Sequence, residues 1–385
     1  MTVAGPGIAV VGGGFMATVH SRAARAAGAR LVGVVASTPE RSREVAASLG
    51  FERGYGSLDE LLADPSVDVV HVCTPNALHA EQALAAIAAG KHVVCEKPLA
   101  TDAATAERLV SAAAEAGVVG TVPFVYRFHP LVREARARVA AGDVGTLLTI
   151  SGSYLQDWLL AQADDNWRVD SAAGGRSRAF ADIGSHLVDL LEFITGAHIT
   201  ELSSTVRTFF AERANTPEVT TEDAAAVVIR LEGGAIGTLL VSQVAPGRKN
   251  RLHLEVAGTE LSIGFDQEAP ETLWLGRRSG TQVLPRDADQ LHPDAARLSI
   301  VPSGHPMGYQ DAFNAFVADS YAAMAGQSPD GLPVRGGRVP SSFLKRAARL
   351  PPGASPRGGR EPRRASCAAA GVASPAAAGA ASRPP

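Results

Sequence analysis

The first 124 residues alternate between short apolar runs and stretches of helical periodicity, and this alternation restricts the fold more than any other feature. The expected strands are Gly7–Val11, Leu31–Ala36, Val67–Cys73, His92–Cys95 and Val118–Val122. The expected helices are Thr18–Ala27, Pro39–Leu49, Ser57–Ala63, Leu78–Ala89 and Ala103–Ala116. Such alternation forms a parallel sheet with right-handed crossovers and helices on both faces. Val- and Ile-rich runs are typical of strands buried on both sides. Residues 1–124 are therefore predicted to form a doubly wound α/β domain.

From about residue 146 the pattern changes to a series of strand-like segments with few helices between them. The expected strands are Leu147–Tyr154, Thr200–Phe210, Ala224–Leu231, Ala235–Gln243, Arg251–Val256 and Glu260–Phe265. Two helices are expected, around Ile183–Ile194 and Gln310–Ala325. Connections such as Glu232-Gly233-Gly234 favour antiparallel hairpins. Residues 125–330 are therefore predicted to form an α+β domain, a meandering sheet with a helix packed on one face.

Composition limits the class of protein. A chain of 385 residues is expected to form about two domains, and 46% hydrophobic residues are ample for packed cores. No apolar stretch approaches the ~20 residues of a membrane span, and the N-terminus lacks the basic region of a signal peptide. Cys73, Cys95 and Cys367 suit neither a disulfide framework nor a metal site. The sequence predicts a soluble, cytoplasmic protein with no metal, and its slightly acidic body argues against a nucleic-acid partner.

A glycine motif follows the first expected strand and opens the first expected helix. The segment Gly12-Gly13-Gly14-Phe15-Met16-Ala17 fits the pattern G-x-G-x-x-A. Between a strand and a helix, Gly12 allows the tight turn and Gly14 lets a pyrophosphate approach the backbone at the helix N-terminus. We therefore predict dinucleotide binding, with Gly12, Gly14, Phe15 and Met16 at the cofactor. The alternative is an ordinary glycine turn.

The end of the second expected strand bears on the choice of cofactor. An Asp or Glu at this place binds the ribose of NAD, but the sequence reads Ala36-Ser37-Thr38-Pro39-Glu40-Arg41. Ser37, Thr38 and Arg41 offer donors for a 2′-phosphate, which favours NADP. The alternative is an ordinary helix start with Pro39 in its first turn.

Two more polar segments follow expected strands of the same sheet. They are Thr74-Pro75-Asn76-Ala77-Leu78-His79 and Cys95-Glu96-Lys97-Pro98. Open α/β sheets bind ligands at the carboxyl ends of their strands. A lysine beside a proline is usually a solvated loop residue, but the buried strand before Lys97 makes this lysine a candidate for the site.

In the second domain, Asp182-Ile183-Gly184-Ser185-His186 opens an expected helix. Asp182 and His186 are spaced i and i+4, so that their side chains share one helix face. A histidine there can exchange a proton with a hydroxyl near neutral pH, and an aspartate can orient or tune it. The alternative is a helix cap at Asp182 and a core histidine at position 186.

Together these residues resemble the Gfo/Idh/MocA family, the group of glucose–fructose oxidoreductase and inositol dehydrogenase. The motifs are G-G-G-F-M-A-T-V-H (12–20), T-P-N-A-L-H (74–79), E-K-P-L (96–99) and D-I-G-S-H-L-V-D (182–189). The resemblance spans about residues 7–330. It implies an N-terminal Rossmann domain, a C-terminal domain with a large open sheet, and a bound NAD(P).

The resemblance also implies roles for individual residues. Lys97 would contact the substrate hydroxyl and help to position the nicotinamide, His186 would be the general acid/base, and Asp182 would be its partner in the substrate pocket. Cofactor contacts are implied for Thr74, Pro75, Asn76, His79, Glu96 and Lys97. The set suits hydride transfer, because an alcohol carbon that loses hydride must also lose its hydroxyl proton. A lysine ammonium stabilises the developing alkoxide while an imidazole accepts that proton.

Aromatic and polar residues around this centre are candidates for substrate binding. Trp158, Trp167 and Arg168 lie between the first strand of the second domain and the Asp182 helix, while Arg127 and Tyr309 lie further along the chain in either direction. Aromatic faces stack on the C–H faces of sugars, and Arg donates to hydroxyls. Alternatively, the tryptophans anchor the loop in the core. The Y-L-Q-D-W and N-W-R segments are similar to the branch with levoglucosan-type dehydrogenases, which favours a pyranose or an anhydrosugar.

The predicted function is transfer of hydride between NAD(P) and a secondary hydroxyl or ketone of a sugar, cyclitol or related polyol. One alternative is net non-redox chemistry, glycoside cleavage through a transient 3-keto sugar with tightly bound NAD. Another is a sensor that binds the cofactor without turnover. A homodimer or homotetramer is expected from the resemblance, because open sheets of this family commonly pair face to face.

The last part of the sequence departs from the family. Residues 331–385 hold ten basic residues and one acidic one, a net charge of +9, and are predicted to be disordered. Relatives usually end in P-x-F-x-D-G, whereas this chain reads Pro333-Val334-Arg335-Gly336-Gly337-Arg338-Val339. Reading those codons one base later permits Phe-Ala-Glu-Asp-Gly-Phe, which favours a frameshift near codon 333. The alternative is a genuine basic tail that binds an acidic surface.

Overall fold

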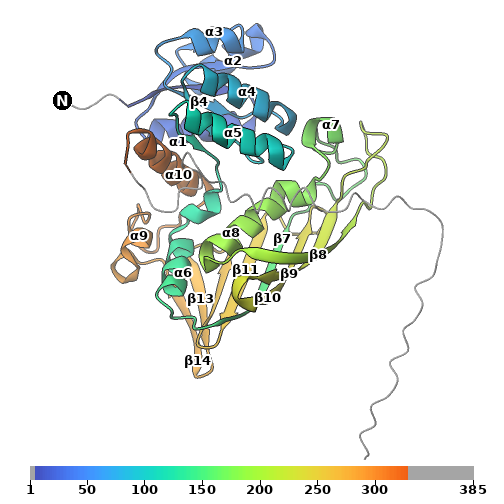
Figure 1. Cartoon of the computed structure of the whole chain (residues 1–385), viewed down its shortest axis with the longest axis vertical. Coiled ribbons are helices and arrows are strands. Elements are labelled where there is room, and N and C mark those ends of the chain that lie inside the picture. Colours follow the sequence, from blue (N-terminus) through green and yellow to red (C-terminus); the bar gives the residue numbers. More distant parts are fainter. Residues whose placement is uncertain (1–4, 328–385) are drawn as a thin grey trace, which may run out of the picture. The chain divides into compact units, whose positions relative to one another are not determined.

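Two sheets organise residues 5–327, the part of the chain that the computed structural model describes (Figure 1). The predictions for residues 331–385, disorder and a frameshift among them, lie outside the described residues. No helix within 5–327 is both long and apolar enough to cross a bilayer.

The first sheet has six parallel strands in the order β3-β2-β1-β4-β5-β6. Its strands are β1 Gly7–Val11, β2 Arg30–Val35, β3 Arg53–Gly54, β4 Val69–Val72, β5 His92–Cys95 and β6 Gly120–Thr121. Its helices are α1 Phe15–Ala26, α2 Pro39–Leu49, α3 Leu58–Ala63, α4 Asn76–Ala88 and α5 Ala103–Glu115. This confirms the predicted doubly wound fold. Strand β3 was not predicted, because two residues are too few to make a recognisable apolar run.

Local sequence signals explain where these helices begin. The side chains of Thr38, Ser57 and Asp102 accept hydrogen bonds from backbone N–H groups in the first turns of α2, α3 and α5. Helix α1 differs, since its N-cap is Gly14, which has no side chain to cap the helix. The N–H groups in the first turn of α1 are therefore left for another acceptor.

The second sheet has eight strands in the order β14-β13-β12-β11-β7-β10-β9-β8. Its strands are β7 Leu147–Leu155, β8 Ile199–Arg207, β9 Ala224–Leu231, β10 Ile236–Ser242, β11 Arg251–Gly258, β12 Ser262–Asp266, β13 Thr272–Arg277 and β14 Gly280–Pro285. Only β7 and β10 pair in parallel, so the prediction of a mostly antiparallel sheet is confirmed. The hairpin β13–β14 extends the sheet beyond the strands that were predicted.

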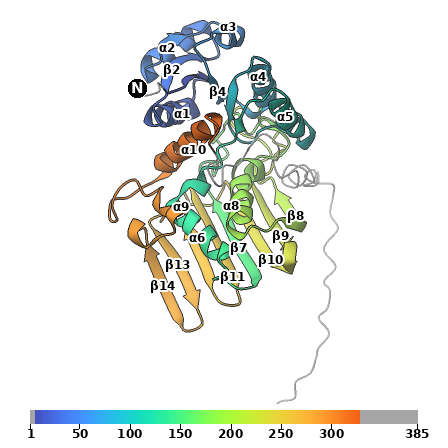
Figure 2. The same ribbon diagram turned by 60° about the vertical axis from the view of Figure 1, so that its left-hand side comes forward.

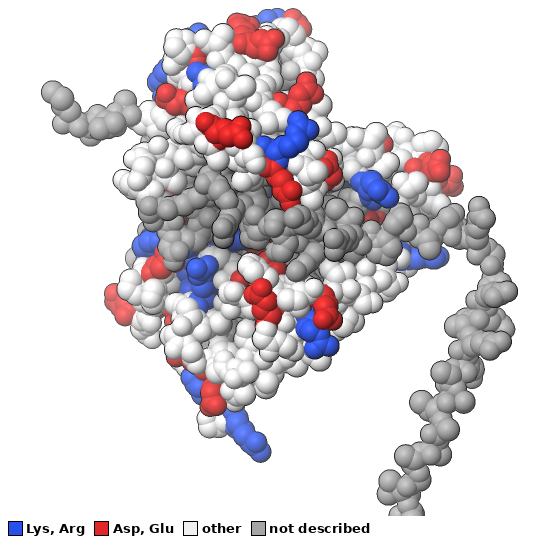
Figure 3. All heavy atoms as spheres, viewed as in Figure 1, with Lys and Arg blue, Asp and Glu red and all other residues white. Residues whose placement is uncertain are grey.

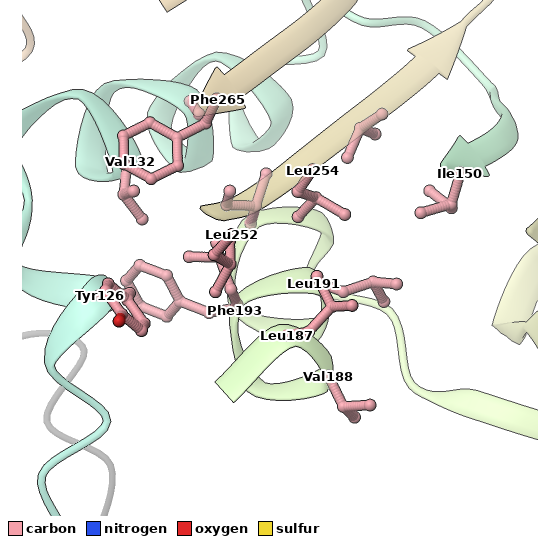
Figure 4. Close-up of a cluster of buried hydrophobic side chains, with 14 of the residues drawn as sticks. Tyr126, Val132, Ile150, Leu187, Val188, Leu191, Phe193, Leu252, Leu254 and Phe265 are labelled. Carbon is pink, nitrogen blue, oxygen red and sulfur yellow. The ribbon is translucent and has the colours of Figure 1, made fainter. Parts of the chain in front are cut away.

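Helices cover one face of this second sheet (Figure 1). The helices and short turns of this region are η1 Val125–Phe128, α6 Pro130–Ala140, α7 Ser171–Gly174, η2 Phe180–Gly184, α8 Ser185–Thr195, η3 Glu232–Gly234, η4 Ala288–Gln290 and α9 Pro293–Ala296. Leu187 and Leu191 of α8 pack among Ile150, Leu252 and Leu254 of the central strands (Figure 4). Burial of these side chains holds α8, and the residues just before it, against the sheet.

The opposite face of the second sheet carries exposed apolar side chains. Alternate residues of a strand point to opposite faces, and the outward positions include Val228, Ile236, Leu240, Trp274 and Val283. A shallow hollow on this face is lined by Arg251, His253, Glu255, Asp266, Trp274 and their neighbours. Several exposed apolar side chains on one sheet face are a feature of interaction sites.

Helix α10 (Tyr309–Met324) departs from the predicted division of the chain. The predicted boundaries place residues 309–324 in the second domain, but α10 packs against α1 of the first (Figure 2). Phe313, Phe316 and Val317 of α10 join the same buried cluster as Val10 and Ala17. Helical periodicity predicted the helix, but it could not indicate which domain the apolar face packs against.

Charged side chains do not gather by sign on the face drawn in Figure 3. Red and blue side chains are interspersed over the described surface there. This face offers neither a strongly basic nor a strongly acidic patch.

His129, at the start of α6, makes folding sensitive to acid. It is buried, stacks on Tyr126, and burial lowers its pKa to about 4. The unfolded value is near 6.5, so between pH 6.5 and 4 the unfolded chain binds more protons. Stability is then full above pH 6.5 and is lost as the pH falls. Through this one group, acidification from pH 7.5 to pH 5 should lower the free energy of unfolding by about 2 kcal/mol.

The measurement is urea unfolding at both pH values, in the wild type and in His129→Phe. We expect the loss of stability on acidification to be about 2 kcal/mol smaller in the variant. The exposed His305→Gln serves as the control and should keep the wild-type pH dependence. An unchanged loss in His129→Phe would contradict the assignment.

Candidate active site

Lys97 and Asp182, 85 residues apart in sequence, form an ion pair at the carboxyl end of β5. The Lys97 Nζ donates to Asp182 Oδ1 at 2.7 Å and to the Asp182 backbone oxygen at 2.8 Å. Both side chains are only 14% exposed. The structure thus joins two of the three predicted catalytic residues, one from each sheet-based domain.

Asp182 lies in η2, a single π-helical turn just before α8. Its Oδ2 accepts a hydrogen bond from Gln243 Nε2 at 2.9 Å, and Arg168 Nε lies 3.4 Å from Oδ1. Burial opposes ionisation, but the positive charges of Lys97 and Arg168 outweigh it and lower the pKa of Asp182 to about 2. Asp182 is therefore a fixed anion at neutral pH.

His186 follows in the first turn of α8 and is enclosed by aromatic rings. The rings of Phe124, Tyr126 and Tyr154 lie 5.6, 5.1 and 6.4 Å from it, centroid to centroid. Burial, helped by the positive charge of Lys97, lowers the pKa of His186 to about 3. The imidazole is therefore neutral at neutral pH, in the form that can accept a proton.

One sequence-based expectation fails at this point, namely that Asp182 orients His186. The Asp182 oxygens contact Lys97, Arg168 and Gln243, and His186 Nδ1 has no hydrogen-bond partner among the described residues. The i, i+4 spacing assumed a regular α-helix, whereas the backbone between the two residues makes a π turn. Asp182 acts instead on Lys97.

The glycine turn has the geometry expected of a cofactor loop. Gly12 has φ +114°, a conformation that favours glycine, and a Cβ at this position would lie 2.6 Å from the Cys73 carbonyl oxygen. A Cβ on Gly14 would meet nothing within 4 Å, so space lies open before the uncapped N-terminus of α1. Phe15 is 73% exposed beside it, Met16 is half-buried, and Ala17 is buried. This loop fits a pyrophosphate.

The residues predicted to select the cofactor lie at the end of β2, next to that loop. Ser37 and Thr38 are exposed, and Thr38 Oγ1 accepts from the Arg41 backbone N–H as the cap of α2. The Arg41 guanidinium pairs with Glu44 at the surface. Thr38 therefore caps α2, as in the alternative of an ordinary helix start. The Ser37 and Arg41 side chains lie at the surface.

Four of the predicted cofactor residues are instead bonded within the protein. Thr74 Oγ1 donates to Gln82, and Asn76 Nδ2 donates to the Gly174 carbonyl oxygen. The His79 ring lies 2.8 Å from the carbonyl oxygens of both Pro98 and Thr74, bridging two loops, and Glu96 contacts His20. Pro75 is the N-cap of α4. These side chains shape the end of the sheet.

Arg127 was predicted to bind substrate, but the structure pairs it with Asp189 of α8. Two guanidinium nitrogens donate to the Asp189 carboxylate, and the group stacks over the Phe193 ring at 4.9 Å. The short η1 turn places Arg127 beside α8, where two of its guanidinium nitrogens are engaged by Asp189.

The other predicted substrate residues, Trp158, Trp167, Arg168 and Tyr309, have partly exposed side chains. The Arg168 guanidinium stacks on Trp167 at 4.3 Å and reaches Asp182. Trp158 donates through Nε1 to Gln156 and packs against a small buried cluster. Burial raises the pKa of Tyr309, and the negative charges of Glu96 and Asp182 raise it further.

Sequence reasoning missed two residues of the site. Gln243 binds Asp182, and Asn250 Oδ1 accepts from both Tyr154 and Gln156. Gln243 is a fully buried polar residue directly after β10, and that placement at a strand end is the signal that could have identified it. Among the described residues, no group of three or more His, Cys, Asp or Glu side chains is placed to hold a metal ion.

Two family models match the chain. One, described as an oxidoreductase family with an NAD-binding Rossmann fold, matches residues 7–124, and the GFO/IDH/MocA C-terminal domain matches residues 132–264. The chain belongs to the Gfo/Idh/MocA family of oxidoreductases. The resemblance carried by the glycine, E-K-P and D-x-G-x-H motifs is thereby confirmed.

The relatives whose names state an activity are oxidoreductases as well. Levoglucosan dehydrogenase of Pseudarthrobacter phenanthrenivorans is 33% identical, over 78% of this chain and 81% of its own. 1,5-anhydro-D-fructose reductase of Ensifer adhaerens is 32% identical, over 74% and 84%. A solved levoglucosan dehydrogenase in complex with NADH and levoglucosan superposes with a TM-score of 0.81 at 29% identity, covering 89% of this chain and 95% of that one.

Proposed function

We propose that this Gfo/Idh/MocA family member moves hydride between NAD(P) and a secondary hydroxyl or ketone of a sugar, cyclitol or related polyol. The observation that carries the proposal is the buried Lys97–Asp182 ion pair, which has His186 on the next helical turn and lies at the carboxyl ends of the Rossmann strands. Alcohol oxidation needs a cation for the oxygen and a base for its proton, and the site holds both.

Lys97 stabilises the substrate oxygen. Two of its three N–H groups donate to Asp182, which leaves one for a ligand. The carboxylate of Asp182 keeps the ammonium charged and in place, so that negative charge developing on the oxygen meets a fixed cation.

His186 receives the hydroxyl proton. Its Nδ1 is buried and has no hydrogen-bond partner within residues 5–327, which leaves Nε2 as the nitrogen that takes the proton. With its pKa lowered to about 3 by burial and by Lys97, the free imidazole is a neutral base throughout the physiological range. In the reverse direction the imidazolium returns the proton to the alkoxide.

A nicotinamide cofactor, when bound, supplies the hydride acceptor or donor. The open α1 N-terminus at Gly14 would hold its pyrophosphate. We favour NADP, because no acidic residue ends β2 and the Ser37 and Arg41 side chains lie at the surface there. Names of relatives include both an NADP(+) and an NAD(+) dehydrogenase. A cytoplasmic location fits such a cofactor and stays a prediction from the sequence.

A pyranose or anhydrosugar is the favoured substrate. Trp167 with the stacked Arg168, and Trp158 with Gln156, place aromatic faces and donors in the loops beside Asp182. The relatives named for levoglucosan and 1,5-anhydro-D-fructose point the same way. The named relatives are dehydrogenases and reductases. Neither glycoside cleavage through a transient 3-keto sugar nor a sensor without turnover is therefore favoured.

The test is an assay at 340 nm with NAD⁺ and NADP⁺ against levoglucosan, glucose, glucose 6-phosphate, inositols and methyl glycosides. Reduced cofactor formed with one compound supports the proposal and identifies cofactor and substrate class. No turnover by folded protein would contradict it. In His186→Asn we expect kcat to fall about a thousandfold with binding of the reduced cofactor, NADPH or NADH, retained. His198→Asn, at the other end of α8, is the control and should keep the wild-type rate.

We also propose that the protein is a homodimer or homotetramer joined through the outer face of the second sheet. The exposed apolar side chains on that face, Trp274 and Val283 among them, support this. Light scattering on the purified protein tests it.

A further inference from the structure

A row of buried polar side chains lies behind Lys97 and takes no part in the proposed chemistry. The Tyr321 hydroxyl lies 2.9 Å from His71 Nε2, and His71 Nδ1 lies 2.8 Å from His20 Nδ1. His20 Nε2 lies 3.0 Å from Glu96 Oε1, and Glu96 Oε2 accepts the Lys97 backbone N–H at 3.1 Å. The row therefore runs from α10 through β4 and α1 to the catalytic lysine.

Each member of the row is shielded from water. His20 and His71 are fully buried, while Glu96 and Tyr321 are 6% and 8% exposed. The His20 ring also makes an edge contact with Phe313 of α10, at a centroid distance of 4.7 Å. In this apolar setting, hydrophobic side chains of similar volume are often at least as stabilising as a buried charged pair. The polar groups therefore call for a role other than stability.

The proton positions in the row are restricted by chemistry. Burial opposes ionisation of Glu96, but the hydrogen bond and charge of His20 outweigh it and lower the Glu96 pKa. An ionised carboxylate only accepts, so His20 Nε2 must donate to it. Burial, followed by the charge of His20, holds the pKa of His71 far below its ordinary value, so that His71 carries a single N–H. The row ends on the Glu96 carboxylate, whose two oxygens accept hydrogen bonds from His20 and from the Lys97 backbone N–H.

We propose that His20, backed by His71, is a positioning residue that holds Lys97 in its catalytic place through Glu96. The proposal rests on the proposed function, since it concerns residues that hold the catalytic Lys97 of that site in place. His20 fixes one Glu96 oxygen, and the other oxygen fixes the backbone of Lys97. The lysine side chain then leaves the end of β5 in the direction of Asp182. Without His20, a buried carboxylate loses its donor, protonates more readily and no longer restrains Lys97.

The groups that face Glu96 come from every element packed around it. They are His20 of α1, Cys73 after β4, His79 of α4, Cys95 and Lys97 around β5, His186 of α8 and Tyr309 of α10. Of these, His20 makes a side-chain hydrogen bond to the carboxylate. Its removal should therefore act on Glu96 first.

The first test is kinetic and uses the full chain with the sugar it oxidises fastest. In His20→Leu we expect kcat to fall about tenfold, KM for the sugar to change less than twofold, and the acidic limb of kcat/KM to move to higher pH. His20→Gln keeps an N–H at the same reach and should restore most of kcat. Ser21→Ala is the matched control and should behave as wild type, because Ser21 is a buried neighbour on α1 whose hydroxyl donates to the Thr18 carbonyl oxygen.

Three results would overturn the proposal. They are wild-type kcat and pH profile in His20→Leu, equal losses in His20→Gln and His20→Leu, and an equal loss in Ser21→Ala. The second would assign the effect to packing, and the third to a general disturbance of α1.

A second measurement needs no turnover and separates this proposal from the proposed function. Trace acetylation followed by mass spectrometry compares Lys97 with Lys249, whose side chain is 80% exposed. We expect the relative acetylation of Lys97 to rise at least about threefold in His20→Leu and to stay unchanged in Ser21→Ala. If the enzyme is inactive but Lys97 responds in this way, only the proposed function fails. If Lys97 does not respond, the positioning role is wrong.

Discussion

Replacing Lys97 with methionine is expected to lower kcat about a thousandfold while leaving the dissociation constant of the reduced cofactor, NADPH or NADH, within about threefold of the wild type. The change removes the ammonium that faces the substrate oxygen and leaves Asp182 with Arg168 and Gln243 as its remaining partners. Since the charge of Lys97 is the foremost influence that lowers the Asp182 pKa against burial, that pKa should also rise. Steady-state kinetics measure kcat, and fluorescence titration with the reduced cofactor measures its dissociation constant.

Lys91→Met is the matched control for this experiment. Lys91 immediately precedes β5 and donates to the carbonyl oxygens of Asp64 and Val67 at the opposite end of the strand. Its replacement should keep kcat within about twofold, since it lies away from the carboxyl ends of the strands where ligands bind. A kcat for Lys97→Met within tenfold of the wild type would contradict the role given to this lysine.

The largest effect on stability is expected at Asp223. Its carboxylate is fully buried and pairs with two buried guanidinium groups, those of Arg178 and Arg213. It also accepts the backbone N–H groups of Phe209 and Phe210. Asp223→Asn removes the carboxylate that pairs with both buried guanidinium groups, and loss of one partner of a buried pair costs about 3–5 kcal/mol. Urea unfolding followed by circular dichroism measures the difference.

A surface pair provides the comparison. Arg30 and Glu52 form an ion pair in which the side chains are 48% and 42% exposed. Glu52→Gln should therefore lower the free energy of unfolding by less than about 1 kcal/mol. Equal effects of Asp223→Asn and Glu52→Gln would show that burial does not control these pairs. Gln243 donates its backbone N–H to the Asp223 carbonyl oxygen and its side-chain amide to Asp182. The Asp223 variant therefore also tests whether this segment holds Gln243 in place beside Asp182.

Much of the fold could be predicted from local patterns. Strands β1, β5 and β9 and helix α2 have the predicted boundaries, and most other elements differ by a few residues at either end. These segments bury alternating or continuous apolar faces, and such periodicity is a property of the segment itself. Strand β3, the hairpin β13–β14 and helices α6, α7 and α9 were missed. The first is too short to show a period, and the second continues a sheet whose edge the sequence does not mark.

The candidate site was predicted in part. The glycine turn, Lys97, Asp182 and His186 were identified because motifs at strand and helix ends can be recognised along the chain. The partners of these residues were less well predicted. Arg127 pairs with Asp189, and Gln243 rather than His186 binds Asp182. Hydrogen bonds depend on atomic positions within a few tenths of an ångström, and residue spacing does not define those positions.

The sequence by itself determined a Rossmann domain followed by a mostly antiparallel sheet, and it determined which residues end the strands. The tertiary structure decided that Lys97 meets Asp182 across 85 residues, that α10 returns to pack on α1, and that His20 reaches Glu96. The physical reason is the range of the forces involved. Backbone propensity and apolar period act within a segment, whereas an ion pair or a packed helix exists only after burial has brought distant segments together.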